Sequence, residues 1–166
     1  ALGTLGVSSI LSCDELNNVN IKKTYPRIIS TWNHGLEANQ KAWEVLKNGE
    51  GGLSAVEKGV MVSEADPKIR SVGYGGYPDR DGIVTLDACI MDKNSNCGSV
   101  SFLQNIKHPI SVARHVMEDT PHVMLSGKGA LDFAVSKGFN QEDLLTGESR
   151  KDWLKWKENS NYKPVI

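Results

Sequence analysis

A glycine-rich loop holds the residues of this sequence that are best suited to binding a ligand. The loop runs from Arg70 to Gly82 and reads Arg-Ser-Val-Gly-Tyr-Gly-Gly-Tyr-Pro-Asp-Arg-Asp-Gly, so three glycines lie close to Ser71. Glycine tolerates positive φ and has no Cβ to hold a neighbour away, so such loops often form tight turns or the floor of a binding site. The loop either presents the Ser71 hydroxyl to a ligand or is a plain connector, and its sequence alone does not decide between the two.

A tryptophan near the start of the chain is the second candidate. Residues Arg27 to Thr31 predict a short apolar strand, and Trp32, Asn33 and His34 follow it directly, before a helix. Ligand contacts in mixed folds often lie at the carboxyl ends of strands, which favours a binding role for Trp32. The alternative is a tryptophan of the hydrophobic core, and this is the role we predict for Trp43 on the helix that follows.

Several common catalytic arrangements are absent from the sequence. The four histidines, His34, His108, His115 and His122, are scattered without the spacing of a metal site, and we expect each to be a surface or structural histidine. Ser71 lacks the flanking glycines of a serine hydrolase, and the glycine loop lacks the lysine of a phosphate-binding loop. No residue has the pattern of a nucleophile with an assembled base.

Composition favours one globular domain. The 166 residues are 39% hydrophobic, and 19 basic residues against 20 acidic ones give a net charge of -1, which offers no electrostatic reason to expect nucleic acid or an anionic membrane as partner. Three cysteines, Cys13, Cys89 and Cys97, cannot all pair and show no zinc or redox spacing. We expect Cys89, inside an apolar strand, to be a small buried hydrophobe.

The first residues differ in kind from the rest. Residues 1 to 12 hold no charge and end at Cys13, which predicts the remnant of a secretory signal and, by a loose match to a lipoprotein box, a possible lipid anchor at Cys13. We therefore divide the chain into residues 1–24, a signal-peptide remnant with a polar linker, and residues 25–166, one domain, and predict export to a bacterial periplasm. No segment is long enough to span a bilayer. The apolar Val-Ile ending resembles a cut through a longer polypeptide.

Periodicity predicts a mixed α/β (α+β) domain. Ser54 and Glu57 have the spacing of a capping box at the start of the second helix, and Trp153 and Trp156 lie three apart on the last helix as a docking or core stripe. An Asp-Lys-Asn-Ser-Asn turn from Asp92 joins two strands into an antiparallel hairpin. The predicted helices cover residues 36–47, 53–65, 109–117, 127–138 and 148–159, and the predicted strands cover 27–31, 83–91, 99–103 and 122–125.

Several of these segments occur together, in the same order, in one enzyme family. They are Ser-Thr-Trp-Asn from Ser30, Ala-Val-Glu-Lys-Gly from Ala55, the loop from Arg70 to Asp79, Thr-Leu-Asp-Ala-Cys-Ile-Met-Asp from Thr85, and the stretches 108–114, 120–125 and 162–164. Over about residues 25 to 166 the chain resembles the α subunit of glycosylasparaginases, also called aspartylglucosaminidases.

The resemblance implies an N-terminal-nucleophile hydrolase with an αββα sandwich, of which this chain is the N-terminal half. In that family an inactive precursor cleaves itself before a threonine, which becomes the first residue of a separate β subunit and the nucleophile. No catalytic residue, metal ligand or cofactor is then expected in this chain. The partner is the β subunit, in an αβ heterodimer that is expected to pair again, and the substrate is a small glycoasparagine. Trp32 and Ser71 correspond to residues of the funnel around the nucleophile.

Two departures and one false match need attention. His34 stands where the family has phenylalanine, which puts the fine substrate preference in doubt and adds His34 to the candidate funnel residues, and Ser54 replaces a common aspartate. The pair Asp119-Thr120 could be mistaken for the cleavage point, but it lies inside an α-subunit motif and is rejected. The alternatives are an asparaginase or isoaspartyl peptidase of the same superfamily, a non-catalytic ligand-binding relative, and an α/β domain without a pocket function.

Overall fold

The computed structural model describes residues 26–163. The predicted signal remnant, the linker and the lipid-anchor candidate Cys13 lie outside the described residues, as do residues 164–166. Within residues 26–163 no helix is long and apolar enough to cross a membrane. The described part is a mixed α/β domain, as predicted, with five helices and a three-stranded sheet.

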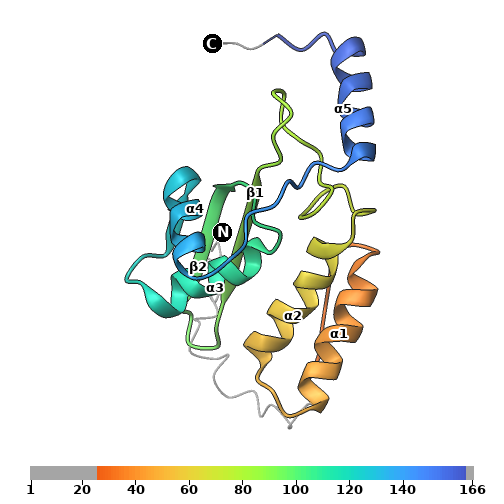
Figure 1. Cartoon of the computed structure of the whole chain (residues 1–166). Coiled ribbons are helices and arrows are strands. Elements are labelled where there is room, and N and C mark those ends of the chain that lie inside the picture. Colours follow the sequence, from red (N-terminus) through yellow and green to blue (C-terminus); the bar gives the residue numbers. More distant parts are fainter. Residues whose placement is uncertain (1–25, 164–166) are drawn as a thin grey trace, which may run out of the picture.

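The first two helices form an antiparallel hairpin at one side of the molecule (Figure 1). Helix α1 spans Gly35–Lys47 and helix α2 spans Gly52–Ala65, close to both predicted ranges. Ala42 and Val45 of α1 bury against Ala55 of α2. Trp43 was wrongly assigned to the core: its side chain is 40% exposed, because Ala42 and Val45 take the inner face of α1.

A small sheet lies beside this hairpin. Strand β1 (Leu86–Met91) pairs antiparallel with β2 (Cys97–Leu103), which confirms the predicted hairpin. Its turn is held by the carboxylate of Asp92, whose Oδ1 accepts from the backbone N of Asn94 at 2.8 Å and of Asn96 at 2.9 Å. Strand β3 (Met124–Ser126) pairs parallel to β2, so the order is β1-β2-β3.

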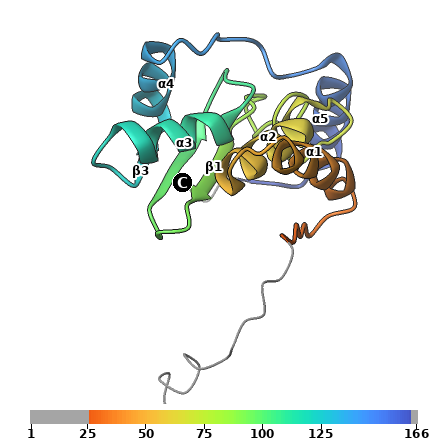
Figure 2. The same ribbon diagram turned by 90° about the horizontal axis from the view of Figure 1, so that it is seen from below.

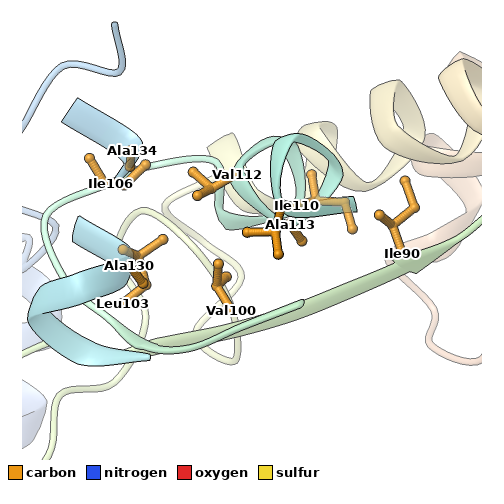
Figure 3. Packing of buried hydrophobic residues seen from close by; sticks show 10 residues of the cluster. Ile90, Val100, Leu103, Ile106, Ile110, Val112, Ala113, Ala130 and Ala134 are labelled. Carbon is orange, nitrogen blue, oxygen red and sulfur yellow. The ribbon is translucent and has the colours of Figure 1, made fainter. Parts of the chain in front are cut away.

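Two helices cover one face of the sheet. Helix α3 (Pro109–Asp119) lies across it and α4 (Gly127–Ser136) covers its edge (Figure 2). Figure 3 shows the contact between strands and helices, where small and branched apolar side chains meet. The buried members of this core are Ile90, Val100, Leu103, Ile106, Ile110, Val112, Ala113, Val116, Ala130 and Ala134.

The opposite face of the sheet has no cover within residues 26–163. Alternation along β1 buries Ile90 and exposes Cys89. The prediction that Cys89 is a buried hydrophobe was therefore wrong, because Cys89 lies on the uncovered face of the strand. Phe102 and Met124 are also more than half exposed on β2 and β3, at 52% and 55%. A free sheet face with large apolar side chains is a surface that another layer could cover.

The last helix stands apart from the others (Figure 1). Helix α5 (Gly147–Asn159) is capped by Thr146, and Arg70 of the glycine loop reaches it through hydrogen bonds from Nη1 to Thr146 Oγ1 at 3.5 Å and from Nη2 to Glu148 Oε2 at 3.3 Å. Trp153 Nε1 donates to the carbonyl of Arg80 at 3.2 Å, whereas Trp156 is 44% exposed. The two tryptophans therefore do not form one buried stripe.

Two predicted local features are not formed. Residues 27–31 are not a strand: within the described residues no strand pairs with them, and Ile29 is 89% exposed. The capping box on α2 is also wrong, because the N-cap is Gly51 and no side chain caps it. Ser54 and Glu57 instead bind the guanidinium of Arg114.

Glu57 joins α2 to α3 through a partly buried ion pair. Its Oε1 accepts from Ser111 Oγ at 2.6 Å and its Oε2 accepts from Arg114 Nη1 at 2.8 Å. Burial by itself would raise the pKa of Glu57, but the hydrogen bonds from Ser111 and Arg114 outweigh it and lower the pKa below 4.5. The ionised carboxylate therefore stabilises the folded state.

We predict that Glu57→Gln lowers the free energy of unfolding at pH 7 by about 1–3 kcal/mol, because Arg114 and Ser111 lose a charged partner. Since the pKa of Glu57 is lowered by folding, its contribution is present above pH 4.5 and is lost as the pH falls through the folded-state value. Urea unfolding of the whole protein at pH 7 and in the acid range measures this contribution to the free energy of unfolding. Glu118→Gln is the control, because Glu118 is an exposed partner of the same Arg114. A wild-type-to-variant difference that grows on acidification would contradict the assignment.

The glycine loop is pressed against the end of α2. Gly73 has φ of +58°, and a Cβ placed there would overlap the backbone of Glu64. The backbone N of Tyr74 donates to the Glu64 carbonyl at 2.7 Å, which fixes the loop in this position. Gly73 is thus required both for its backbone conformation and for this close approach.

We predict that Gly73→Ala destabilises the protein by more than about 2 kcal/mol, since positive φ alone costs an alanine about 1 kcal/mol and the collision with Glu64 adds to that cost. Gly49→Ala is the matched control, because Gly49 has φ of +85° and nothing within 4 Å of an added Cβ. Thermal unfolding of both variants separates the two contributions, and equal losses of stability would show that the close approach has no cost.

Candidate active site

One cavity gathers all three residues that the sequence singled out. It has a volume of about 460 Å³ and lies between the start of α1, the end of α2, the glycine loop and β1. Trp32, His34 and Ser71 all line it. A larger groove of about 920 Å³ runs between the loop at Tyr77 and α5, but none of those three residues reaches it.

Trp32 lies in the turn that leads into α1. Its carbonyl accepts from Gly35 N at 2.9 Å, and its side chain is 71% exposed, so the alternative of a core tryptophan is wrong for the described part of the chain. The predicted strand before it is not formed, yet Trp32 does stand just ahead of a helix, at the border of the cavity.

His34 occupies the N-cap position of α1 without capping it. Its backbone is in the αR region, with φ of -67° and ψ of -12°, and its side chain makes no cap hydrogen bond. The ring turns to α2, where Nδ1 lies 3.0 Å from Ser63 Oγ. Ser63 is only 6% exposed and also lines the cavity.

This Ser63–His34 contact is not a complete catalytic triad. In such triads a carboxylate orients the ring nitrogen that the serine does not use. Within residues 26–163 no carboxylate binds His34, whose only other hydrogen bond is from its backbone N to Asn33 Oδ1 at 2.9 Å. The contact fixes a ring orientation and does not by itself assemble a nucleophile with a base.

Ser71 is exposed at the glycine loop. Its hydroxyl makes no hydrogen bond to any residue of the described part, 26–163, and is thus available to a ligand as donor or acceptor. Because the contacts of Gly73 and Tyr74 with Glu64 attach the loop to α2, the backbone that carries the Ser71 hydroxyl has a defined position on the cavity wall.

Glu64 is a cavity residue that sequence reasoning missed. It is 2% exposed, its Oε1 accepts from the backbone N of Ile110 at 3.0 Å, and its Oε2 lies 3.1 Å from His108 Nδ1. Burial raises the pKa of Glu64 although both partners act to lower it. A signal was present: Glu64 follows Val60 by four residues, so it continues the inward face of α2.

Two of the histidines have carboxylate partners that the sequence analysis missed, although the four-residue spacing of His115 and Asp119 on one helix was a signal for the second pair. His108 pairs with Glu64, and His115 Nδ1 lies 2.8 Å from Asp119 Oδ2 on the same helix. No group of three metal-ligating side chains occurs within residues 26–163.

The rejected cleavage pair is built into a turn. Thr120 Oγ1 donates to the carbonyl of Val116 at 2.7 Å and accepts from the backbone N of His122 at 3.0 Å, at the end of α3. Its hydroxyl therefore has a structural role that fits the rejection of Asp119-Thr120.

The charges of the cavity wall limit what it can bind. The described residues that line it include the carboxyl groups of Glu64 and Asp87 but no lysine or arginine. This wall suits hydroxyl, amide or ammonium groups, and a ligand carboxylate would need a cation from elsewhere.

Comparison with known proteins gives a consistent assignment. The sequence profile of the family described as Asparaginase matches residues 20–165. The chain is 57% identical over all of its 166 residues to an N(4)-(Beta-N-acetylglucosaminyl)-L-asparaginase of Elizabethkingia miricola, and spans 48% of that protein. It is 44% identical over 141 residues to the enzyme of the same name from Rattus norvegicus, which covers 82% of this chain and 41% of that protein.

A protein of Drosophila melanogaster named as a putative N(4)-(beta-N-acetylglucosaminyl)-L-asparaginase is 46% identical over 136 residues, which are 79% of this chain and 34% of that protein. The chain thus spans about half the length, or less, of these relatives. The resemblance found in the sequence is confirmed: this chain belongs to the asparaginase family.

Proposed function

We propose that this chain is one part of an amidohydrolase that cleaves the bond between N-acetylglucosamine and asparagine in glycoasparagines and releases aspartate and the amino sugar. The observation that carries the proposal is the 57% identity over the whole chain to the Elizabethkingia enzyme of that name. The cavity that joins Trp32, His34 and Ser71 supports it, since an exposed indole and free hydroxyl suit a sugar-bearing amide.

The proposed nucleophile is a threonine outside this chain. In this proposal a precursor cleaves itself, and the new N-terminal threonine of a β subunit attacks the amide carbon while its own α-amine takes the hydroxyl proton. The C–N bond then breaks, the amino sugar leaves with that proton, and water hydrolyses the ester to aspartate. Trp32 would shape the substrate end of the pocket, and Ser71 would hydrogen-bond near the nucleophile and the aspartyl group.

One sequence comparison and two features of the described residues support a second half of this kind. The chain covers only 48% of the Elizabethkingia protein, the cavity wall lacks a cation for the substrate carboxylate, and one face of the sheet has no cover. We propose that the β subunit covers that face as the second sheet of an αββα sandwich, in an αβ heterodimer that pairs again. Export to a periplasm and lipid attachment at Cys13 remain proposals.

An asparaginase or isoaspartyl peptidase is the second candidate function. The family profile that matches is described as Asparaginase, so hydrolysis of an unglycosylated amide fits the same match. A non-catalytic relative would have the cavity without the threonine. The first candidate is favoured because the relatives are named for the glycosylated substrate.

The experiment that tests the proposal is expression of the complete gene, followed by intact-mass analysis, N-terminal sequencing and assay on N-acetylglucosaminyl-asparagine. We expect a second polypeptide that begins with threonine and release of aspartate. A product that is never cleaved, or a partner with another first residue, would favour the non-catalytic relative, and hydrolysis of asparagine alone would favour the asparaginase.

We predict that Trp32→Ala and Ser71→Ala each lower kcat/KM for the glycosylated substrate by about tenfold, equivalent to about 1.4 kcal/mol, and leave precursor cleavage largely intact. The first loses an aromatic surface and the second a hydrogen bond. Trp43→Ala and Ser136→Ala are matched controls, because neither residue lines the cavity. Unchanged kinetics in a cleaved Trp32 or Ser71 variant would refute its role.

A further inference from the structure

The half-buried His34 contacts the buried Ser63, and the proposed function gives this contact no role. It joins residues 29 positions apart, with Nδ1 of the ring 3.0 Å from Ser63 Oγ. Ser63 is 6% exposed on the inner side of α2, and that contact is the only hydrogen bond of its hydroxyl within residues 26–163. If Nδ1–H donated to Ser63 Oγ, the buried hydroxyl hydrogen would have no acceptor among these residues, so the arrangement that satisfies both groups has Ser63 O–H donating to Nδ1.

The contact determines what the other ring nitrogen offers. When a serine hydroxyl donates to Nδ1, a neutral imidazole carries its proton on Nε2, which is then a hydrogen-bond donor. Nε2 of His34 has no partner in the described part of the chain, and His34 and Trp32 line the same cavity. Ser63 holds the ring through this hydrogen bond, and the backbone of His34 is at the N-cap position of α1.

We infer that His34 is a specificity-determining residue whose Nε2–H donates to a hydroxyl or acetamido oxygen of the sugar, next to the Trp32 indole. This inference rests on the proposed function and deepens it, because it assigns recognition of the sugar to one side chain. An indole that provides an apolar surface and an imidazole that provides a directed donor are complementary to a ring with alternating C–H and O–H groups.

The charges on the cavity wall limit which group can accept the Nε2–H hydrogen bond. Among residues 26–163, the carboxylic acids that line this cavity are the buried Glu64 and Asp87 on β1, and no lysine or arginine lines it. The substrate's own carboxylate is therefore disfavoured in this part of the cavity, and its ammonium group has no acceptor for an Nε2–H donor. The neutral sugar, which offers hydroxyl and acetamido oxygens, is the group of a glycoasparagine that fits beside His34.

The test compares two substrates on the enzyme made from the complete gene. We expect His34→Phe, which keeps an aromatic ring but has no donor, to lower the ratio of kcat/KM for N-acetylglucosaminyl-asparagine to that for asparagine by about five- to tenfold. His34→Gln, which can place an amide N–H near the position of Nε2, should recover part of the ratio. Ser63→Ala should lower it by about two- to threefold, because the ring loses its orientation.

The matched control is a histidine outside the cavity, tested with the same two substrates. His122→Phe should not change the ratio, because the exposed His122 does not line the cavity. An unchanged ratio in a cleaved, active His34→Phe enzyme overturns the inference and leaves the proposed function intact. Complete loss of activity on both substrates in Ser63→Ala also overturns it, since Ser63 would then act in catalysis. A wild-type enzyme without activity on either amide overturns the proposed function itself.

Discussion

The buried carboxylate of Glu64 is the interaction on which the cavity depends. A carboxylate that is 2% exposed is costly unless it is hydrogen-bonded, and here the donors are the backbone of Ile110 and the ring of His108. Pro109 begins α3 without an N–H, so Ile110 is the first residue of that helix able to donate. The position at a helix N-terminus adds a favourable dipole. The raised pKa of Glu64 shows that burial still outweighs these partners.

Glu64 also holds the glycine loop in place, through its backbone. Its carbonyl accepts from Tyr74, and Gly73 lies against it, so the glycine loop, the end of α2 and the start of α3 meet at one position. Ser71 can therefore sit on an irregular loop and still have a defined location. A rigid attachment of this kind is what a binding residue on a loop requires, because loops otherwise move more than the elements they connect.

The sequence predicted the elements better than it predicted their exposure. The helices at 36–47 and 53–65 and the hairpin around Asp92 follow from local signals, namely apolar periodicity, glycine stops and a turn, and these survive in the fold. The errors at Trp43 and Cys89 concern which side of an element is covered, whereas at Ile29 the predicted strand itself is not formed. Both kinds of error depend on segments distant in sequence. The cavity residues Trp32 and Ser71 were found through the resemblance and the glycines, whereas Glu64 resembled any acidic residue on a helix.

The proposed second half would explain both the uncovered face of the sheet and the lack of a complete set of catalytic groups in residues 26–163. Within residues 26–163, Phe102 is uncovered on the sheet, the cavity wall has no lysine or arginine, and the Ser63–His34 contact has no acidic partner. A second layer would bury the sheet face, and a nucleophile that carries its own base would need only shape and hydrogen bonds from this chain. In that arrangement the folding of the two halves and the assembly of the active site are one event, because the surface that stabilises the sandwich is continuous with β1, where Asp87 and Cys89 line the cavity.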